Sequence, residues 1–367
     1  MKTIRRWGGF RERNDVAQAV NPDGLTVRRG SHRLTFLALA AVLVGLGLAA
    51  LALGPVAISP DRVIATLFGA GDGVESAIIL QIRLPRLLLG IAVGTALALA
   101  GASLQGVLRN PLADPGLIGV SAGATVGAVL VIVVGERFGA GLPDALRPWL
   151  LPGAAFLGAG VVIAFVFALA RRGGETSVAT LILAGVAVNT VAGAIVGVMV
   201  YISDDQQLRD LTFWTLGALS ASSLQTTLIA SAIALLTVPA FIRGTRALDL
   251  FQLGERAAFH SGLNVERAKV VVALATAVSV GAVTAAAGPI GFIGLVAPHL
   301  ARMIVGPSHA FILPTAVMLG VALILAADLA VRLAVPPAEP PIGLATSIIG
   351  GPFFLWLLIR NRGRLHA

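Results

Sequence analysis

The sequence predicts an all-α polytopic membrane protein with ten transmembrane helices. Of its 367 residues, 57% are hydrophobic and only 12% are charged, whereas a soluble globular chain carries roughly a quarter charged residues. Ten apolar segments approach or exceed the length of about 20 helical residues that a bilayer core requires. Glycine is also abundant, with 43 residues, and small residues allow membrane helices to pack closely.

The predicted spans follow one another along most of the chain. The first, residues 34–53, contains no charged residue. The 33 residues ahead of it exceed the usual n-region of a signal peptide, so we expect this segment to be retained as a helix. The other spans are expected at residues 87–108, 116–134, 150–170, 178–202, 224–242, 267–287, 292–304, 310–333 and 342–359.

Lysine and arginine are distributed unevenly between the two sides of the predicted membrane. Ten spans place both termini on one side, and with both in the cytoplasm 20 of the 27 basic residues face that compartment. This asymmetry follows the positive-inside rule. It also explains the net charge of +9, so we predict no nucleic-acid partner. Residues 1–33 would form an arginine-rich cytoplasmic tail, residues 34–362 the transmembrane domain and residues 363–367 a C-terminal tail.

Two regions carry helix breakers beside long helices. Asn110-Pro111 and Asp114-Pro115 follow the second span, and Gly288-Pro289 precedes the short eighth. Proline removes a backbone donor and clashes with the preceding turn. Non-helical backbone at membrane depth persists only where protein buries it or water reaches it. Because each region follows a long helix, we predict an inverted repeat of spans 2–5 and 7–10.

Glycines recur at helical spacing in two spans. Gly119, Gly123 and Gly127 lie in the third, and Gly193 and Gly197 lie in the fifth. A spacing of four residues places them on one helix face, where a neighbouring helix can approach closely. This neighbour is expected within the chain, with a subunit interface as the alternative.

The sequence contains no machinery for ATP hydrolysis or other catalysis. A phosphate-binding P-loop requires Gly-Lys, and neither Lys2 nor Lys269 follows a glycine. Cysteine is absent, and no His-Glu-x-x-His motif occurs. We therefore predict no catalytic residue, no metal site and no permanently bound cofactor. Ionisable groups within the spans are sparse, Asp328 being one, so an ion-coupled secondary transporter is only the alternative to a chain powered by a partner.

The longest internal cytoplasmic loop, residues 243–266, is amphipathic. Leu250, Leu253 and Ala257 are spaced for short helices, with Gly254 and Gly262 as hinges or caps. Exposed apolar residues on such a loop require a cover. That cover would be a docked partner or, if the helices lie on the membrane, lipid.

Motifs spread over about residues 58–362 complete the pattern. They are Arg83-Leu84-Pro85-Arg86; the runs from Gly101 to Gln105, from Asn110 to Ala113 and from Pro115 to Gly119; Leu253-Gly254-Glu255 with residues 261–267; the runs from Gly288 to Leu295 and from Pro298 to Arg302; and those from Glu339 to Gly343 and from Gly350 to Phe354. In this order and combination they resemble the permeases of type II ABC importers for iron-siderophores, haem and vitamin B12.

This resemblance implies an assembly in the bacterial inner (cytoplasmic) membrane. Two copies of the permease would form a homodimer around a translocation path, surrounded by membrane lipid. Two copies of a cytoplasmic ATP-binding subunit would dock below and use the ATP, and a periplasmic substrate-binding protein would dock above. The permease itself would then be a transport subunit and not an enzyme.

The resemblance also implies roles for individual residues. Coupling to the ATPase would fall to Leu253, Gly254, Glu255 and Arg256 in the predicted coupling helices at residues 243–266. The binding protein would dock on Arg83, Arg86 and Arg332, which can form bidentate bonds to its carboxylates. The alternative is that these arginines snorkel to the outer interface. The translocation path and its cytoplasmic gate would involve Asn110, Leu112, Val178, Ala179 and Asn189.

The stretch from Arg209 to Gly217, after the fifth span, is most similar to haem permeases, so we predict haem as the cargo. A ferric siderophore or cobalamin carried by the same machinery is the alternative. Val178-Ala179-Thr180 is more apolar than the hydroxyl-rich gate of some cobalamin permeases, which disfavours cobalamin. We expect a mostly apolar path that holds haem loosely, with Tyr201 as an interfacial aromatic residue.

Overall fold

The computed structural model describes residues 29–139, 141–173, 175–220, 223–336 and 338–361. Most of the predicted N-terminal tail, residues 1–28, and the C-terminal tail at 363–367 lie outside these ranges. The elements, in chain order, are α1 (Arg29–Ala52), α2 (Pro60–Leu67), α3 (Gly73–Ser76), the π-helical segment η2 (Ala77–Arg83), α4 (Leu84–Val107), the 3-10 turn η3 (Pro115–Ile118), α5 (Val120–Gly139), α6 (Arg147–Ala170), β1 (Arg171–Arg172), β2 (Glu175–Thr176), α7 (Val178–Ile202), α8 (Asp205–Thr215), α9 (Leu224–Arg243), α10 (Thr245–Gln252), α11 (Glu255–His260), α12 (Val265–Ala287), α13 (Ile293–Val305), α14 (His309–Ala334) and α15 (Ile342–Asn361).

A helix occupies each of the ten predicted spans. In the part of the chain that the structure describes, seven apolar helical segments are long enough to cross a membrane: His32–Ala52, Gly73–Val107, Arg147–Ala170, Val178–Ile202, Leu224–Arg243, Val265–Ala287 and His309–Ala334. The remaining three predicted spans coincide with shorter apolar stretches at Val120–Gly135, Ile293–Val305 and Ile342–Leu355. The prediction of a mostly helical, polytopic membrane protein is confirmed, and α1 extends to Arg29, into the segment assigned to the tail.

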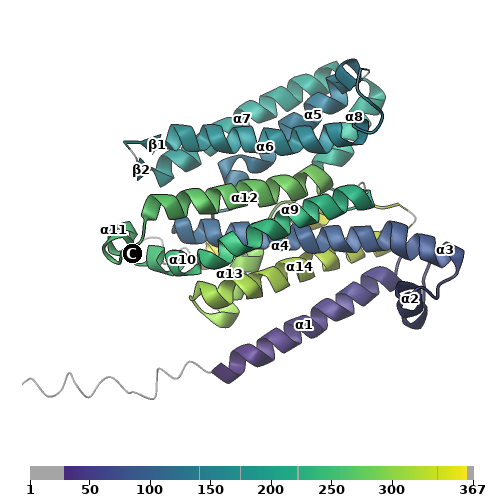
Figure 1. The fold of residues 1–367 in the computed structure, drawn as a ribbon, viewed down its shortest axis with the longest axis horizontal. Helices are drawn as coiled ribbons and strands as arrows, with labels where there is room; N and C mark the ends of the chain where they lie inside the picture. The colour runs from purple at the N-terminus through teal and green to yellow at the C-terminus, as the bar shows by residue number, and fades with distance from the viewer. Residues whose placement is uncertain (1–28, 140, 174, 221–222, 337, 362–367) are drawn as a thin grey trace, which may run out of the picture.

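Helices α4 and α12 form the centre of the bundle, while α1 and α7 lie along opposite edges (Figure 1). Both central helices are rich in alanine, α4 also in glycine, and most of their residues are buried. Small side chains permit close approach. At Gly101 of α4, an added Cβ would lie 1.8 Å from the carbonyl oxygen of Gly294 in α13. A larger residue at Gly101 would therefore push these two helices apart.

Each central helix packs against helices from the other half of the chain. Helix α4 contacts α13 and α14, and α12 contacts α5 and α6. If spans 2–5 correspond to spans 7–10, α4 corresponds to α12, α5 to α13 and α6 to α14. The contact of α4 with α13 then corresponds to that of α12 with α5, and the contact of α4 with α14 to that of α12 with α6. The inverted repeat itself stays a prediction.

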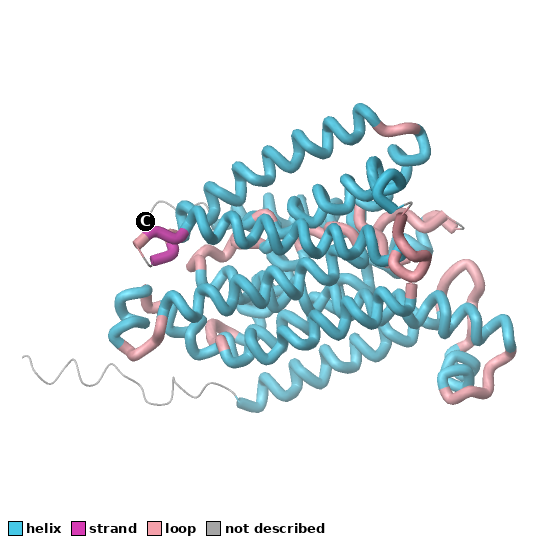
Figure 2. Tube along the Cα trace, turned by 45° about the horizontal axis from the view of Figure 1, so that its top comes forward, coloured by secondary structure: helices cyan, strands magenta, loops and turns pink. Residues whose placement is uncertain are grey.

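Short elements gather at the two ends of the bundle. Helices α10 and α11 and the strands β1 and β2 lie at one end, and α2, α3 and α8 lie at the other (Figure 1). Strands β1 and β2 pair antiparallel, with Arg171 opposite Thr176. Within the described residues they form the only sheet, drawn in magenta in Figure 2. The hairpin joins α6 to α7 and so fixes where α7 begins.

Candidate functional site

The end of the bundle that carries α10 and α11 holds a wide groove. Its volume is about 1240 Å³, and its lining includes all four residues predicted to couple to a partner: Leu253, Gly254, Glu255 and Arg256. Leu253 is 70% exposed and Phe259 67% exposed. Apolar side chains this exposed at the rim of a groove favour a protein contact there.

The joint between α10 and α11 depends on Gly254. Its φ of +100° lies in a region that favours glycine. On α10, the apolar residues Ala247, Leu248 and Phe251 are buried against the bundle. The structure thus confirms two short helices in the loop at residues 243–266, with glycine at the hinge and one apolar face turned inward.

A buried histidine anchors α10 to α14. His309 is 1% exposed, and its Nδ1 lies 2.7 Å from Oδ1 of Asp249. The same carboxylate oxygen accepts a hydrogen bond of 2.8 Å from the backbone N–H of His309. Gln252 donates to the carbonyl oxygen of Pro307 at 3.0 Å. These contacts hold α10 against the first turn of α14. Asp249 and His309 are far apart in the chain, so no sequence pattern predicted that they would meet.

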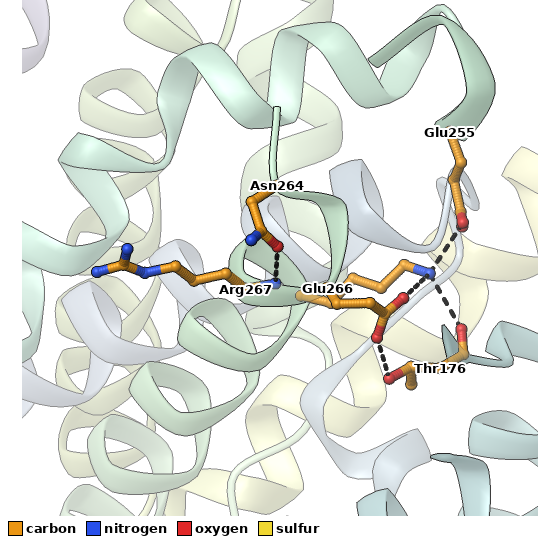
Figure 3. A network of polar contacts seen from close by, with 6 residues as sticks. Thr176, Glu255, Asn264, Glu266 and Arg267 are labelled. Carbon is orange, nitrogen blue, oxygen red and sulfur yellow. Dashed lines mark hydrogen bonds and ion pairs between the residues drawn. The ribbon is translucent and has the colours of Figure 1, made fainter. Parts of the chain in front are cut away.

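Lys269 joins α11, α12 and the β hairpin. Its Nζ donates to Oε2 of Glu255 at 2.9 Å, to Oε1 of Glu266 at 3.2 Å and to the carbonyl oxygen of Thr176 at 3.0 Å. Thr176 also donates through its hydroxyl group to Glu266 at 2.7 Å. Figure 3 shows these side chains converging, while the guanidinium group of Arg267 points away. Sequence reasoning found Glu255 but not its ion pair with Lys269.

The predicted gate residues lie in the irregular segment between α4 and α5. Asn110 accepts a hydrogen bond from the backbone N–H of Leu112 at 2.9 Å, which forms a tight turn. Asn189 of α7 donates to the carbonyl oxygen of Gly116 at 3.1 Å. An added Cβ at Gly185 would lie 2.0 Å from the carbonyl oxygen of Leu117. Helix α7 is therefore packed directly on this segment through Gly185 and Asn189.

The other two predicted path residues, Val178 and Ala179, form the first turn of α7. They lie roughly 16 Å along the helix from Asn189, at 1.5 Å per residue. Ser177 caps this turn by accepting from the N–H of Thr180 at 3.3 Å. The structure thus separates the five residues into one group at the start of α7 and another group around η3.

The glycines of the two predicted faces differ in their surroundings. Added Cβ atoms at Gly123 and Gly127 would lie 2.3 and 2.1 Å from carbonyl oxygens of α6, so these glycines mediate packing within the chain. At Gly193 and Gly197, by contrast, no described atom other than the adjoining backbone of α7 lies within 4 Å of an added Cβ. Helix α7 therefore presents an open face with small residues.

The three arginines predicted to dock a binding protein are buried near the opposite end of the bundle. Arg86 donates to Asp328 at 2.8 Å and pairs with Glu339, while Arg332 lies 3.2 Å from the same aspartate. Arg83 donates to the backbone oxygens of Leu51, Ala52 and Val56 at the end of α1 and just beyond it. In this conformation these guanidinium groups face other residues of the chain. The docking role stays a prediction.

These features match a known group of transport proteins. Residues 41–360 match the FecCD transport family. The chain belongs to this family. The FecCD chain is 46% identical over 283 residues to the hemin transport system permease protein HmuU of Yersinia pestis, which covers 77% of this chain and 83% of that protein. It is 39% identical over 291 residues to the cobalamin import system permease protein BtuC of Halobacterium salinarum, covering 79% and 75% of the two chains.

A solved structure shares the fold of the FecCD chain. It is described as an inward-facing conformation of a metal-chelate type ABC transporter, with a TM-score of 0.78 and 30% sequence identity. The match covers 89% of this chain and 99% of that one. The resemblance to the siderophore, haem and vitamin B12 permeases is thereby confirmed.

Proposed function

We propose that this FecCD chain is the transmembrane permease subunit of an ATP-driven importer. It would move haem from a periplasmic binding protein across the inner membrane into the cytoplasm. The observation that carries this proposal is the 46% identity to the hemin permease of Yersinia pestis over 77% of the chain. The exposed groove at α10 and α11 supports it, since an importer without its own ATPase requires a surface where one can dock.

Ten spans with both termini in the cytoplasm are part of the proposal. The three shorter apolar helices would complete the seven longer ones, with α13 ending at Val305 and α5 following the broken segment. The domain would then run from residue 34 to 362 between two cytoplasmic tails. The end with α10, α11 and the β hairpin would face the cytoplasm, and the end with α2, α3 and α8 would face the periplasm.

The homodimer would place α7 next to the path. Most of α7 is exposed within the single chain, and Gly193 and Gly197 face open space. An exposed glycine pair suits contact with a second helix better than contact with lipid. The cargo would pass between the two copies, along the predicted path residues at the start of α7 and around η3.

The alternative cargo is a ferric siderophore or cobalamin. The cobalamin permease of Halobacterium salinarum is 39% identical to this chain, and all these cargoes would use the same coupling surface. The apolar start of α7 at Val178 and Ala179 favours a flat apolar cargo such as haem. An ion-coupled secondary transporter is the second alternative, and it would leave the groove at α10 and α11 without a role.

Uptake into proteoliposomes tests the cargo. The permease would be reconstituted with its cognate ATPase and binding protein, with ATP inside, and offered haem, a ferric siderophore or cobalamin. We expect ATP-dependent accumulation of haem alone. Accumulation of a different cargo would overturn the haem assignment and keep the importer, whereas accumulation of none with an assembled, ATP-hydrolysing complex would contradict the importer itself.

A further inference from the structure

Lys269 is 3% exposed, and it is the only lysine among the described residues. Its ammonium group has three hydrogens and donates to three acceptors, two of them carboxylates. A buried ammonium is tolerated only when it is paired and fully hydrogen-bonded. The Nζ atom of Lys269 therefore holds α11, α12 and the hairpin together.

Each acceptor comes from a different element with a different role. Glu255 is the first residue of α11, in the groove predicted to receive the ATPase. Thr176 ends strand β2 and directly precedes Ser177, the N-cap of α7. Glu266 lies in the first turn of the central helix α12. Lys269 therefore connects Glu255 of the groove to the hairpin residue that precedes the N-cap of α7.

The hairpin is fixed to α12 through both its backbone and its side chain. Lys269 holds the carbonyl oxygen of Thr176, and Glu266 accepts from the Thr176 hydroxyl group at 2.7 Å. Thr176 is itself buried, with 4% exposure. By contrast, Glu255 reaches Lys269 from beyond the glycine joint at Gly254. A displacement of α11 would thus act on Lys269 first and on the hairpin next.

We propose that Lys269 is a positioning residue that transmits movement of the coupling helix α11 to the β hairpin and the first turn of α7. This inference rests on the proposed function, because it assumes that an ATPase docks at the groove. When α11 moves, Glu255 carries the ammonium group with it, and the bond to the carbonyl oxygen of Thr176 shifts the hairpin. The first turn of α7, with Val178 and Ala179, follows because Ser177 caps it.

A purely structural anchor would give a different result from a transmitting contact. An anchor stabilises the chain, and its loss lowers assembly, ATP hydrolysis and transport together. A transmitting contact sets how much transport each ATP produces. The ratio of cargo imported to ATP hydrolysed in the assembled complex separates the two roles.

The first experiment measures this ratio for Lys269→Met in proteoliposomes with the ATPase and the binding protein. We expect ATP hydrolysis to be retained and haem imported per ATP to fall about tenfold, within the usual range of coupling between sites. Lys269→Arg, which keeps the charge, should recover part of the ratio. The control is Arg267→Met, which removes a cation from the same helix turn outside this network. An unchanged ratio for Lys269→Met, or a parallel loss of hydrolysis and transport, would overturn the inference.

A second experiment is independent of the cargo. The chain has no cysteine, so spin labels can be placed uniquely at the exposed positions Glu175→Cys in the hairpin and His260→Cys in α11. In the complex, we expect the distance between the labels to stay within its nucleotide-free distribution when ATP and vanadate are added. With Lys269→Met, the distribution should shift or broaden on nucleotide binding.

The milder variant Thr176→Val protects this test against misfolding of Lys269→Met. It removes the bond to Glu266 and keeps the carbonyl oxygen that Lys269 holds, so we expect an intermediate broadening. Identical distributions in all variants would overturn the inference even if transport is confirmed. If the distance distribution is preserved with Lys269 and shifts or broadens with Lys269→Met, but no haem is taken up, the inference is supported. Only the proposed cargo is then contradicted.

Discussion

At the residue scale, the least expected feature is a group of buried charges near the end of the bundle opposite the groove. Asp328 is 3% exposed and lies between Arg86 and Arg332. Breaking a buried ion pair leaves an uncompensated charge, which costs far more than losing a pair at the surface. This group therefore controls how firmly α4 and α14 are held together.

Replacement of Asp328 by Asn should destabilise the chain strongly. We expect the free energy of unfolding to fall by about 3 kcal/mol, since two buried guanidinium groups lose their shared carboxylate. The measurement is unfolding of the purified permease by SDS in mixed micelles. Asp72→Asn is the matched control, because Asp72 is 75% exposed in its pair with Arg62 and should change stability by less than about 1 kcal/mol. Equal effects of the two variants would contradict this account.

The same burial changes how the docking prediction for Arg83 and Arg86 must be tested. Charge reversal at these positions would place a carboxylate among backbone oxygens or beside Asp328, so lost docking could follow from lost folding alone. Arg86→Lys is better suited, because it keeps the positive charge beside Asp328 and removes only the forked guanidinium group. If Arg86 docks the binding protein, affinity for that protein should fall about tenfold, since an ammonium group cannot make the bidentate contact to a carboxylate, and basal ATP hydrolysis of the complex should remain. Unchanged affinity would remove Arg86 from the docking site.

Residue roles were predictable only where a local motif carried them. Gly254 was recognisable as a hinge from its place between two amphipathic turns, and the structure shows the positive φ that requires glycine. Lys269 and His309 were not recognisable, because their partners Thr176 and Asp249 lie far away in the chain. A single sequence contains no record of which distant polar groups meet.

At the scale of elements, the exposed apolar face of α10 and α11 gives a prediction about docking. Leu253 and Phe259 are 70% and 67% exposed, so replacing both by serine should leave the stability of the isolated permease nearly unchanged. Affinity for the ATPase should fall at least about tenfold, since two buried apolar side chains at an interface contribute more than 1.4 kcal/mol. Binding can be measured with the purified subunits in nanodiscs.

The control for this docking test is Phe68→Ser. Phe68 is 87% exposed and follows α2 at the opposite end of the bundle, so its replacement should not alter ATPase affinity. If Phe68→Ser weakened binding as much as the double variant, the groove would not be the docking surface.

The open glycine face of α7 gives a prediction about the dimer. A single cysteine at Gly193 should form a disulfide between two copies under mild oxidation, because a second α7 would lie against this face. Gly45→Cys is the control, since Gly45 of α1 also has no atom within 4 Å of an added Cβ but has bulky apolar neighbours that suit lipid. Rapid cross-linking at Gly45 and none at Gly193 would place the interface on α1.

The long elements were predictable, and several short ones were not. Apolar length alone located all ten of the helices at the predicted spans, and the breakers at Asn110-Pro111 and Gly288-Pro289 coincide with irregular backbone. Helices α2 and α3 and the β hairpin were missed because such short elements carry too little periodicity to stand out. Helix α8 has 11 residues but is polar on average, so a search for apolar length did not find it. The hairpin matters most, since it holds Thr176 beside Lys269.

At the scale of the whole molecule, the question is where the energy for transport comes from. A proton-coupled carrier requires an ionisable group that can gain and lose a proton during the cycle. Asp328, a candidate within a described span, is held by two arginines, so a proton carried by this carboxylate would have to disrupt contacts that join α4 to α14. Neutralising this carboxylate would take away the ion-pair partner of Arg332 and leave Arg86 with Glu339 alone, which makes Asp328 a poor proton carrier.

We therefore expect uptake to depend on ATP hydrolysis and not on a proton gradient. In proteoliposomes with the ATPase and binding protein, a protonophore should leave the rate of uptake within about twofold of its untreated value. This corresponds to a change of less than about 0.5 kcal/mol in the activation free energy. A hydrolysis-deficient ATPase in the same vesicles should abolish uptake, and this comparison controls for leaks and for cargo adsorption. The permease alone, under an imposed gradient, should accumulate nothing. Gradient-driven accumulation by the permease alone would contradict this expectation and assign Asp328 to proton transfer. The groove at α10 and α11 would then lie on the membrane surface, because no partner would be needed to cover it.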